Sequence, residues 1–226
     1  MRELPAGHDA VLLDFSDHEV PWRGAVRAAQ RLRAAMAAGA LPAVIDVIPA
    51  AQTVLVQAES GAGLDRLGVR RALRDTPAED ADGFEVGQTV SIAVAYEGAD
   101  LPEVAQAIGC SVNDVISAHS QLTWRVQFVG FAPGFGYLVP DTSPPTGSAA
   151  AALCSLGRRA TARPSVPAGS VAVAAGYSAV YPRESPGGWN LLGHRVIRTG
   201  DEPLWDVTAQ PPALLGPGRT VRFEPC

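Results

Sequence analysis

Hydrophobic and polar positions change period along the first 75 residues, from strand-like runs to a helical repeat and back. Short apolar runs predict strands at residues 10–15, 43–48 and 53–58. Apolar side chains recur at helical spacing from Trp22 to Met36, and a second helical pattern covers residues 63–75. This β-α-β-β-α order predicts a small two-layer α+β domain.

Arginines line the polar face of the first predicted helix, at Arg23, Arg27 and Arg31. Such a stripe can attract an anion, but an exposed helix face is usually charged without binding a ligand. We therefore interpret these arginines as a solvated helix face rather than an anion site.

A polar, turn-rich segment at residues 76–83 separates this region from the rest of the chain. We place the domain boundary there, with one domain at residues 1–82 and another at 83–226. The alternating pattern at residues 89–96 predicts the first strand of the second domain.

Two short helices are predicted between residues 100 and 120. Asp100 is followed by Glu103, and Ser111 by Asp114, with the spacing of a capping box at a helix N-terminus. The second helix places His119 on its apolar face. Such a histidine is more often a core residue than a catalyst, yet His119 is also the candidate general acid–base, and both interpretations stay open.

From residue 122 onward the patterns are nearly all those of strands, short and separated by Pro and Gly, which predicts a barrel or a sandwich. Residues 139–165 have the composition of a long irregular loop that ends in Arg158, Arg159 and Arg163. Guanidinium groups delivered by such a loop can clamp a carboxylate or a phosphate. Solvated surface arginines are the alternative.

The net charge, the apolar runs and the cysteine pattern limit the partners, the location and the metal sites expected for this chain. The net charge of −5 disfavours nucleic acid as a partner. No uncharged apolar run is long enough to span a membrane, and residues 1–15 lack the apolar core of a signal peptide, so a cytoplasmic location is expected. Cys110, Cys154 and Cys226 form no zinc or disulfide pattern, and no metal site is expected.

All 18 basic residues of the chain are arginine, so it contains no lysine. A Walker A phosphate loop, a Schiff-base mechanism and a biotin-carrying lysine are therefore excluded within it. The H-E-x-x-H and G-x-S-x-G signatures are absent as well.

Four segments rich in Gly and Pro follow one another in the second half of the chain. They are "VQFVGFAPGFGYL" (126–138), "RRATARPSVPAGSVAVA" (158–174), "YPRESPGGWNLLG" (181–193) and "PGRTVRF" (217–223). In residues and order they resemble the family of the 5-oxoprolinase B subunit, which is also labelled allophanate hydrolase subunit 1 or KipI-like. The chain departs from the family pattern at Gly136, Gly157, Ala162, Tyr177 and Arg219. These departures concern substrate preference and activity rather than the fold.

The resemblance implies a small α+β N-terminal domain followed by a cyclophilin-like β-barrel. It also implies a complex with two partners, the C subunit (another such barrel) and the A subunit. This complex opens the lactam of 5-oxo-L-proline to L-glutamate. ATP would bind in the assembled complex, since this chain carries no nucleotide-binding motif. Two alternatives stay open: a KipI-type inhibitor of a histidine kinase, and a carboxyltransferase component of a urea carboxylase or allophanate pathway, with biotin on another chain.

The same segments predict a pocket for a small carboxylate or cyclic amide. Arg158 and Arg163 would hold the anionic group of the substrate or of a phosphorylated intermediate. Glycines without a Cβ let the backbone approach a ligand, and aromatic side chains would form an apolar wall. The predicted substrate-binding residues besides the arginines are Gly134, Phe135, Gly136, Tyr137, Ser185, Gly187, Gly188 and Trp189. Phe131 would join the wall, and His119 is the predicted catalytic residue. The chain alone is expected to be inactive.

Overall fold

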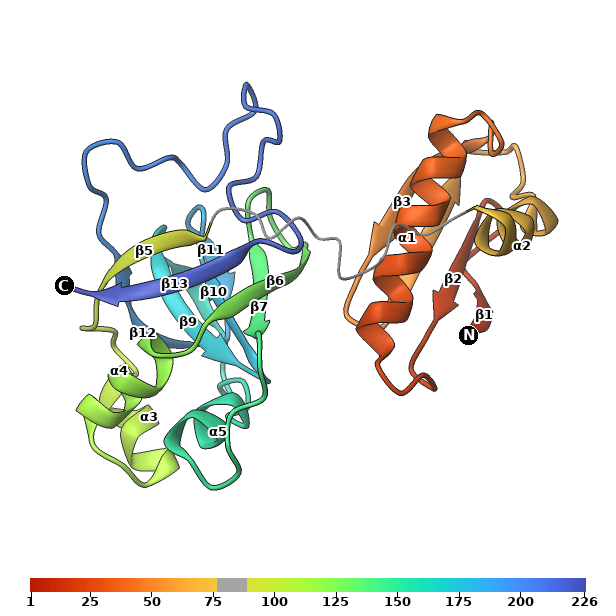
Figure 1. Cartoon of the computed structure of the whole chain (residues 1–226). Helices are drawn as coiled ribbons and strands as arrows, with labels where there is room; N and C mark the ends of the chain where they lie inside the picture. Colours follow the sequence, from red (N-terminus) through yellow and green to blue (C-terminus); the bar gives the residue numbers. More distant parts are fainter. Residues whose placement is uncertain (77–88) are drawn as a thin grey trace. The chain divides into compact units, whose positions relative to one another are not determined.

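The computed structural model describes residues 1–76 and 89–226, and its contacts divide the chain into two units, Met1–Glu85 and Val86–Cys226 (Figure 1). The boundary predicted between residues 82 and 83 lies outside the described residues. Each unit has hydrophobic core clusters of its own, so each is described by itself.

The N-terminal unit is an antiparallel sheet in the order β1-β2-β4-β3 with two helices packed on it. Its elements are β1 (Arg2–Pro5), β2 (Ala10–Asp14), α1 (Pro21–Ala37), β3 (Val44–Pro49), β4 (Thr53–Ala58) and α2 (Arg66–Asp75). Pro21 suits the first turn of α1 because its ring fixes φ and its missing N–H would have no partner there. Leu32 of α1 is fully buried against the sheet. The two-layer α+β prediction is confirmed, with β1 as an additional strand.

The second unit contains a closed barrel in the strand order β10-β7-β6-β13-β5-β12-β9. These strands are β5 (Val90–Ala95), β6 (Trp124–Val129), β7 (Gly136–Pro140), β9 (Ser170–Ala174), β10 (Tyr177–Val180), β12 (Asn190–Arg195) and β13 (Thr220–Pro225). Neighbours pair antiparallel, except that β13 runs parallel to β5. Trp124, Phe135 and Phe223 fill the interior. The sequence-based prediction of a mixed α+β chain with a barrel is confirmed.

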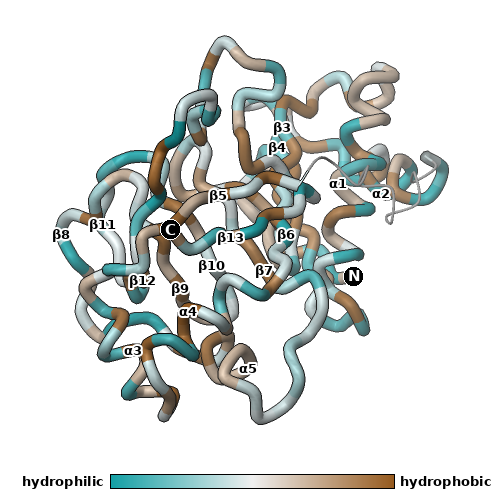
Figure 2. The backbone as a smooth tube through the Cα atoms, turned by 60° about the vertical axis from the view of Figure 1, so that its left-hand side comes forward, coloured by the Kyte–Doolittle hydropathy of each residue, from teal (hydrophilic) through white to brown (hydrophobic). Residues whose placement is uncertain are grey.

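Three short helices, α3 (Leu101–Ile108), α4 (Val112–Ser120) and α5 (Ala149–Cys154), gather at one end of the barrel (Figure 1). They pack on a small core of their own that includes Leu153 and Leu192. In Figure 2 the hydrophobic segments follow the barrel strands, whereas the connections are mostly hydrophilic or intermediate. No helix within the described residues is both long and apolar enough to cross a membrane.

The prediction of an irregular loop over residues 139–165 is wrong, because this segment contains α5 and the strand β8 (Arg163–Val166). Ser148 begins α5, since its Oγ accepts a hydrogen bond from the N–H of Ala151, and a run of alanines favours the helix. The strand β8 pairs outside the barrel with β11 (Ser185–Gly187).

The two predicted capping boxes have different outcomes. Ser111 and Asp114 form one at the start of α4, as predicted. Asp100 does not cap α3 with its side chain, because its carboxylate binds side chains and a backbone N–H from elsewhere in the barrel unit.

A chain of residues 86–226 is expected to fold without the N-terminal unit. Both of its core clusters consist only of residues from within that range, so each cluster stays complete when residues 1–85 are removed. Far-UV circular dichroism and a dispersed ¹H–¹⁵N spectrum check this outcome. A collapsed spectrum typical of an unfolded chain would contradict it.

Candidate functional site

A pocket of about 330 Å³ opens in the barrel unit where four separate segments meet. These are the loop before β7 with the start of that strand, the segment before β8, the residue after β10, and β11 with the residues that follow it. The pocket brings together the predicted residues Phe135, Tyr137, Arg158, Gly187, Gly188 and Trp189. Phe131 also lines it, as expected for the apolar wall, and Ala162, Tyr181 and Pro186 complete it.

Aromatic rings form the walls of this pocket, packed edge to face. The Phe135 ring centroid lies 5.2 Å from that of Tyr181 and 5.6 Å from that of Trp189. Tyr137 contacts Trp189 at 5.7 Å between centroids. Because the rings support one another from several sides, the pocket is preformed, with flat apolar surfaces suited to a small ring.

Two phenol groups give the pocket hydrogen-bond donors. Burial raises the pKa of Tyr137, although the charge of Arg158 opposes this. Burial and the neighbouring Tyr137 raise the pKa of Tyr181, opposed by Arg158 and Arg163. Both phenols are therefore protonated at neutral pH and can donate to a carbonyl or carboxylate oxygen.

A glycine makes room for one of these hydroxyls. A Cβ added at Gly187 would collide with the Tyr181 hydroxyl, so only glycine lets that group occupy its place beside the pocket. The "SPGGW" segment thus contributes to the site through close packing as well as through its tryptophan.

Arg158 is the charged group of the pocket. Its side chain is exposed and has no hydrogen-bond or ion-pair partner within residues 1–76 and 89–226. A guanidinium group in this state can bind a carboxylate with two parallel hydrogen bonds. Arg158 therefore lies where an anion clamp would need it, and its role in binding stays a prediction.

Arg163 lies elsewhere, in an ion-pair network around the carboxylate of Asp100. Asp100, only 2% exposed, accepts hydrogen bonds at 2.6 Å from both Arg163 and Arg159, and at 2.7 Å from the backbone N–H of Leu191. Arg163 does not line the pocket of Arg158. Arg163 is therefore not a solvated surface arginine, since its side chain is 26% exposed and its guanidinium group is paired with Asp100 of the same chain.

Hydrogen bonds on both sides of Arg158 fix the segment that carries it. Arg159 also donates its backbone N–H to the carbonyl of Gly188 at 2.8 Å, and Asn190 donates to the carbonyl of Gly157 at 2.9 Å. The backbone on each side of Arg158 is therefore held in place, while its side chain lines the pocket and has no hydrogen-bond partner in the described residues. The sequence did not predict that Asp100 binds Arg159 and Arg163, because its spacing to Glu103 is that of a helix cap.

Gly134, Gly136 and Ser185 do not line the pocket. A Cβ at Gly134 would lie 2.7 Å from the carbonyl oxygen of Leu204, and one at Gly136 would lie 3.1 Å from Leu215 Cβ. Ser185 is buried and donates to the carbonyl of Arg183. These residues shape the barrel rather than contact a ligand in this arrangement.

Phe131, in the loop before β7, has an unusual backbone conformation. It is 58% exposed, and its φ of +68° lies in the left-handed region that side chains with a Cβ seldom adopt. A residue held in this conformation beside a pocket is typical of a functional loop.

His119 lies in the protein interior and does not line the pocket. It is fully buried, with Nδ1 2.7 Å from the Tyr96 hydroxyl and Nε2 2.8 Å from the Ser178 hydroxyl. Its ring also packs on Phe223, 4.4 Å between centroids. The geometry therefore supports the interpretation of His119 as a residue of the protein core. It gives no support to the general acid–base hypothesis.

The barrel unit is expected to lose stability as the pH falls from about 6.5. Burial lowers the pKa of His119 to about 3, whereas an unfolded histidine titrates near 6.5. Below 6.5 the unfolded state therefore binds a proton that the folded state does not, and the free energy of unfolding falls by up to about 1.4 kcal/mol per pH unit. Urea titrations of residues 86–226 between pH 7.5 and 4.5 measure this slope. The His119→Gln variant lacks the titrating imidazole, so an equal dependence of its free energy of unfolding on pH would contradict this prediction.

Replacing Asp100 with asparagine is expected to destabilise the barrel unit by about 3–5 kcal/mol, since it leaves two partly buried arginines without their shared charge. Glu103→Gln is the matched control. Glu103 binds the same Arg159 but is 68% exposed, so its loss should cost less than about 1 kcal/mol. Urea denaturation compares the two variants. Similar losses in both would contradict the buried network.

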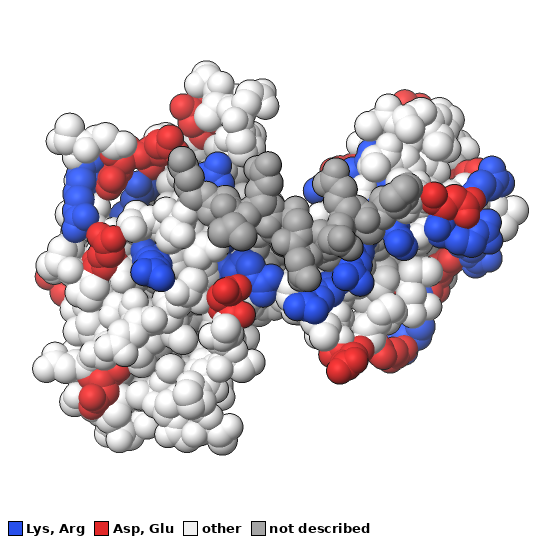
Figure 3. All heavy atoms as spheres, in the orientation of Figure 1, with Lys and Arg blue, Asp and Glu red and all other residues white. Residues whose placement is uncertain are grey.

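Arg158 and Arg159 also line a second pocket of the barrel unit, of about 350 Å³, together with Glu103 and Asn190. On the face shown in Figure 3, arginine and acidic side chains are interspersed, and the area over the helices carries few charges. No group of His, Cys, Asp and Glu in the described parts of the chain is arranged to hold a metal ion.

Comparisons with known proteins agree with this architecture. The family model of the carboxyltransferase domain, subdomain C and D, matches residues 1–215. The B subunit of 5-oxoprolinase from Escherichia coli O157:H7 is 35% identical over 189 residues, 82% of this chain and 79% of that protein.

Two solved structures are also similar. The crystal structure of TTHA0988 has a TM-score of 0.75 and 34% identity, covering 96% of this chain and 40% of that chain. The urea amidolyase of K. lactis has a TM-score of 0.70 at 16% identity, covering 99% of this chain and 15% of that chain, which shows the fold alone. This chain therefore corresponds to a part of each of these two larger proteins.

Proposed function

The chain belongs to the family of the 5-oxoprolinase B subunit and carries the carboxyltransferase domain, subdomain C and D, and on this premise we propose that its barrel pocket binds the cyclic amide of an ATP-dependent 5-oxoprolinase. One observation carries the proposal: Arg158, with no ion-pair partner in the described residues, stands over a preformed aromatic pocket that contains two phenol donors. 5-Oxo-L-proline has one carboxylate, one small flat ring and one carbonyl oxygen. Each of these groups has a counterpart in the pocket.

Arg158 binds the substrate carboxylate, and the lactam ring lies against Phe135 and Trp189. The hydroxyl of Tyr181, or of Tyr137, then donates a hydrogen bond to the lactam carbonyl oxygen. Such a bond strengthens as negative charge develops on that oxygen, so it favours the transition state over the ground state. The role of this chain is thus to hold and polarise the substrate.

The remaining chemistry needs the partner proteins. Transfer of the γ-phosphoryl group of ATP to the lactam oxygen activates the ring carbon, water adds to it, and cleavage of the C–N bond gives glutamyl phosphate and ADP. A second water molecule then releases phosphate and L-glutamate. The described residues that line the pocket include no histidine, carboxylate or thiol that could act as the base. We therefore infer that the C and A subunits complete the site, and that ATP binds in the assembled complex.

A second candidate function rests on the carboxyltransferase match over residues 1–215. In that case the same pocket holds an amide or ureido acceptor, and carboxybiotin on another chain delivers the carboxyl group. Both candidates place the acceptor beside the aromatic wall. They differ in the required co-substrate, which makes them separable by assay.

The test is glutamate release from 5-oxo-L-proline by this chain, alone and with its partner proteins. The proposal predicts ATP-dependent release by the complex and none by the isolated chain. Robust hydrolysis by the isolated chain would contradict the assignment of the remaining chemistry to the partners. Carboxylation that requires biotin, or inhibition of a histidine kinase without any hydrolysis, would replace the proposal by one of its rivals.

A further inference from the structure

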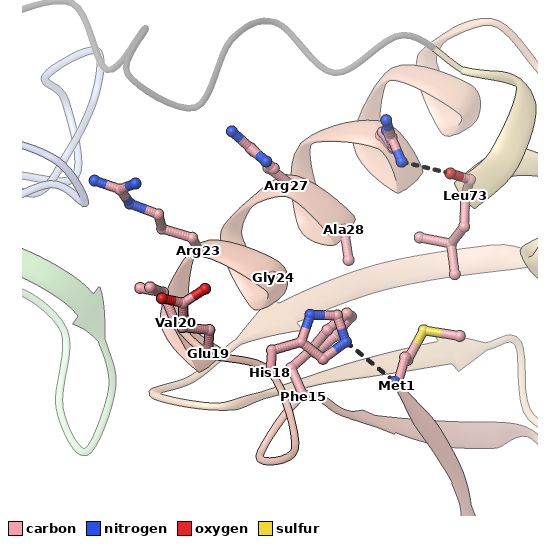
Figure 4. A pocket seen from close by; sticks show the side chains of 11 residues that line it. Met1, Phe15, His18, Glu19, Val20, Arg23, Gly24, Arg27, Ala28 and Leu73 are labelled. Atoms are coloured by element: carbon pink, nitrogen blue, oxygen red, sulfur yellow. Dashed lines mark hydrogen bonds between the residues drawn. The ribbon is translucent and has the colours of Figure 1, made fainter.

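A second pocket, of about 510 Å³, lies in the N-terminal unit beside the first half of α1 (Figure 4). All the residues that line it belong to this unit, so it is separate from the pocket of Arg158. The arginine stripe that the sequence suggested as a solvated helix face, Arg23, Arg27 and Arg31, forms one side of it.

Arg23 and Arg27 give this pocket a concentrated positive charge. They are four residues apart on α1, which is about 6 Å along the helix axis, and Figure 4 shows both side chains directed to the same side of the helix. Both are exposed, and neither has an ion-pair partner within the described residues. Like charges at this spacing repel each other, so the pair is more stable when an anion lies between or beside them.

Nearby acidic groups do not cancel this charge. Glu19 is the one carboxylate among the described lining residues, against three arginines. Asp17, on the same loop, is directed to Arg2, with 3.3 Å between its Oδ2 and the arginine Nε. Arg31 adds its charge at the inner end of the pocket, where it donates to the carbonyl of Leu73 at 2.8 Å.

The floor of the pocket is apolar. Phe15, Ala28 and Leu73 line it, and Phe15 lies tightly under the helix, since a Cβ at Gly24 would come within 2.7 Å of its ring. The pocket therefore combines a cationic side with an apolar base. Its volume is within the range of pockets that hold small organic ligands.

We propose that this pocket binds a small organic compound that carries linked phosphate groups. Arginine pairs with phosphate oxygens through two hydrogen bonds at once, so two neighbouring arginines are well suited to successive phosphates. Linked phosphates carry more charge and offer more acceptor oxygens than a single carboxylate, so they can pair with both guanidinium groups bidentately. The organic part of the compound rests on Phe15, Ala28 and Leu73.

Isothermal titration of the full chain with ATP and with inorganic tripolyphosphate tests the proposal. The pocket variant carries Arg23→Ala and Arg27→Ala together, and the control carries Arg66→Ala and Arg71→Ala, two exposed arginines of α2 outside the pocket. We expect saturable binding of ATP, at least tenfold weaker in the pocket variant and unchanged within threefold in the control. Circular dichroism confirms that both variants are folded.

Three results would overturn the proposal. They are no saturable binding of ATP by the wild-type chain, equal weakening by the two double variants, and binding of ATP that is no tighter than that of tripolyphosphate. The last result would mean that the floor contributes nothing and that the arginines attract any polyanion. None of these results depends on hydrolysis of 5-oxo-L-proline, so the barrel site is tested separately.

Discussion

Replacing Arg158 with alanine is expected to lower kcat/KM of the assembled complex for 5-oxo-L-proline by roughly 10- to 100-fold. Charge-assisted hydrogen bonds contribute about 1.5–3 kcal/mol, and each 1.4 kcal/mol is a factor of about ten. Most of the loss should be in KM, because Arg158 holds the carboxylate and not the reacting carbonyl. Stability should change by less than about 0.5 kcal/mol, since the side chain is exposed and has no ion-pair partner in the described residues.

Two further variants sharpen this prediction. Arg158→Lys keeps the charge but loses the planar fork, so its kcat/KM should lie between those of the wild type and the alanine variant. Arg183→Ala removes an exposed arginine close in sequence to the pocket residues but not among those that line it, and it should leave the rate unchanged. Steady-state glutamate release measures all three. Equal loss in Arg158→Ala and Arg183→Ala would contradict a specific role for Arg158.

A large effect on stability is also expected from His119→Ala, which should lower the free energy of unfolding of the barrel unit by roughly 3–5 kcal/mol. The substitution leaves a cavity among Trp124, Phe223 and Tyr96, whose rings contact the imidazole. It also removes the hydrogen-bond partner of the Tyr96 and Ser178 hydroxyls, and a buried unpaired hydroxyl costs about 1–3 kcal/mol.

Urea denaturation of residues 86–226 measures this loss, with His194→Ala as the control. The side chain of His194 is 49% exposed, so its removal should cost less than about 0.5 kcal/mol. The conservative variant His119→Gln separates structure from catalysis. Where it folds, it should keep kcat in the assembled complex, and a large fall in kcat without loss of folding would restore the general acid–base hypothesis.

Local signals in the sequence predicted the elements that local interactions determine. The strand at 53–58 and the capping box of Ser111 and Asp114 depend on residues close together in the chain, and both are present as expected. The pocket was predicted in outline for a similar reason. Its aromatic and glycine residues stand together in the short segments 130–138 and 185–189.

Interactions between distant residues were not predictable from these signals. Asp100 has the spacing of a helix cap, but its partners Arg159 and Arg163 are 59 and 63 residues away in the chain. Gly134 had the features of a ligand-binding glycine, yet the close approach of Leu204 explains its lack of a side chain. Only the closed barrel brings such residues together.

Binding of 5-oxo-L-proline by Arg158 and the aromatic pocket can be measured without catalysis, by equilibrium dialysis of the labelled compound against the assembled complex in the absence of ATP. We predict saturable binding, weakened at least tenfold by Arg158→Ala and unchanged by Arg183→Ala. Competition by 2-pyrrolidone, which has the lactam but no carboxylate, should be weak and equal in the wild type and in Arg158→Ala. Equal affinity of the wild type and Arg158→Ala for 5-oxo-L-proline would contradict the proposed role of this pocket.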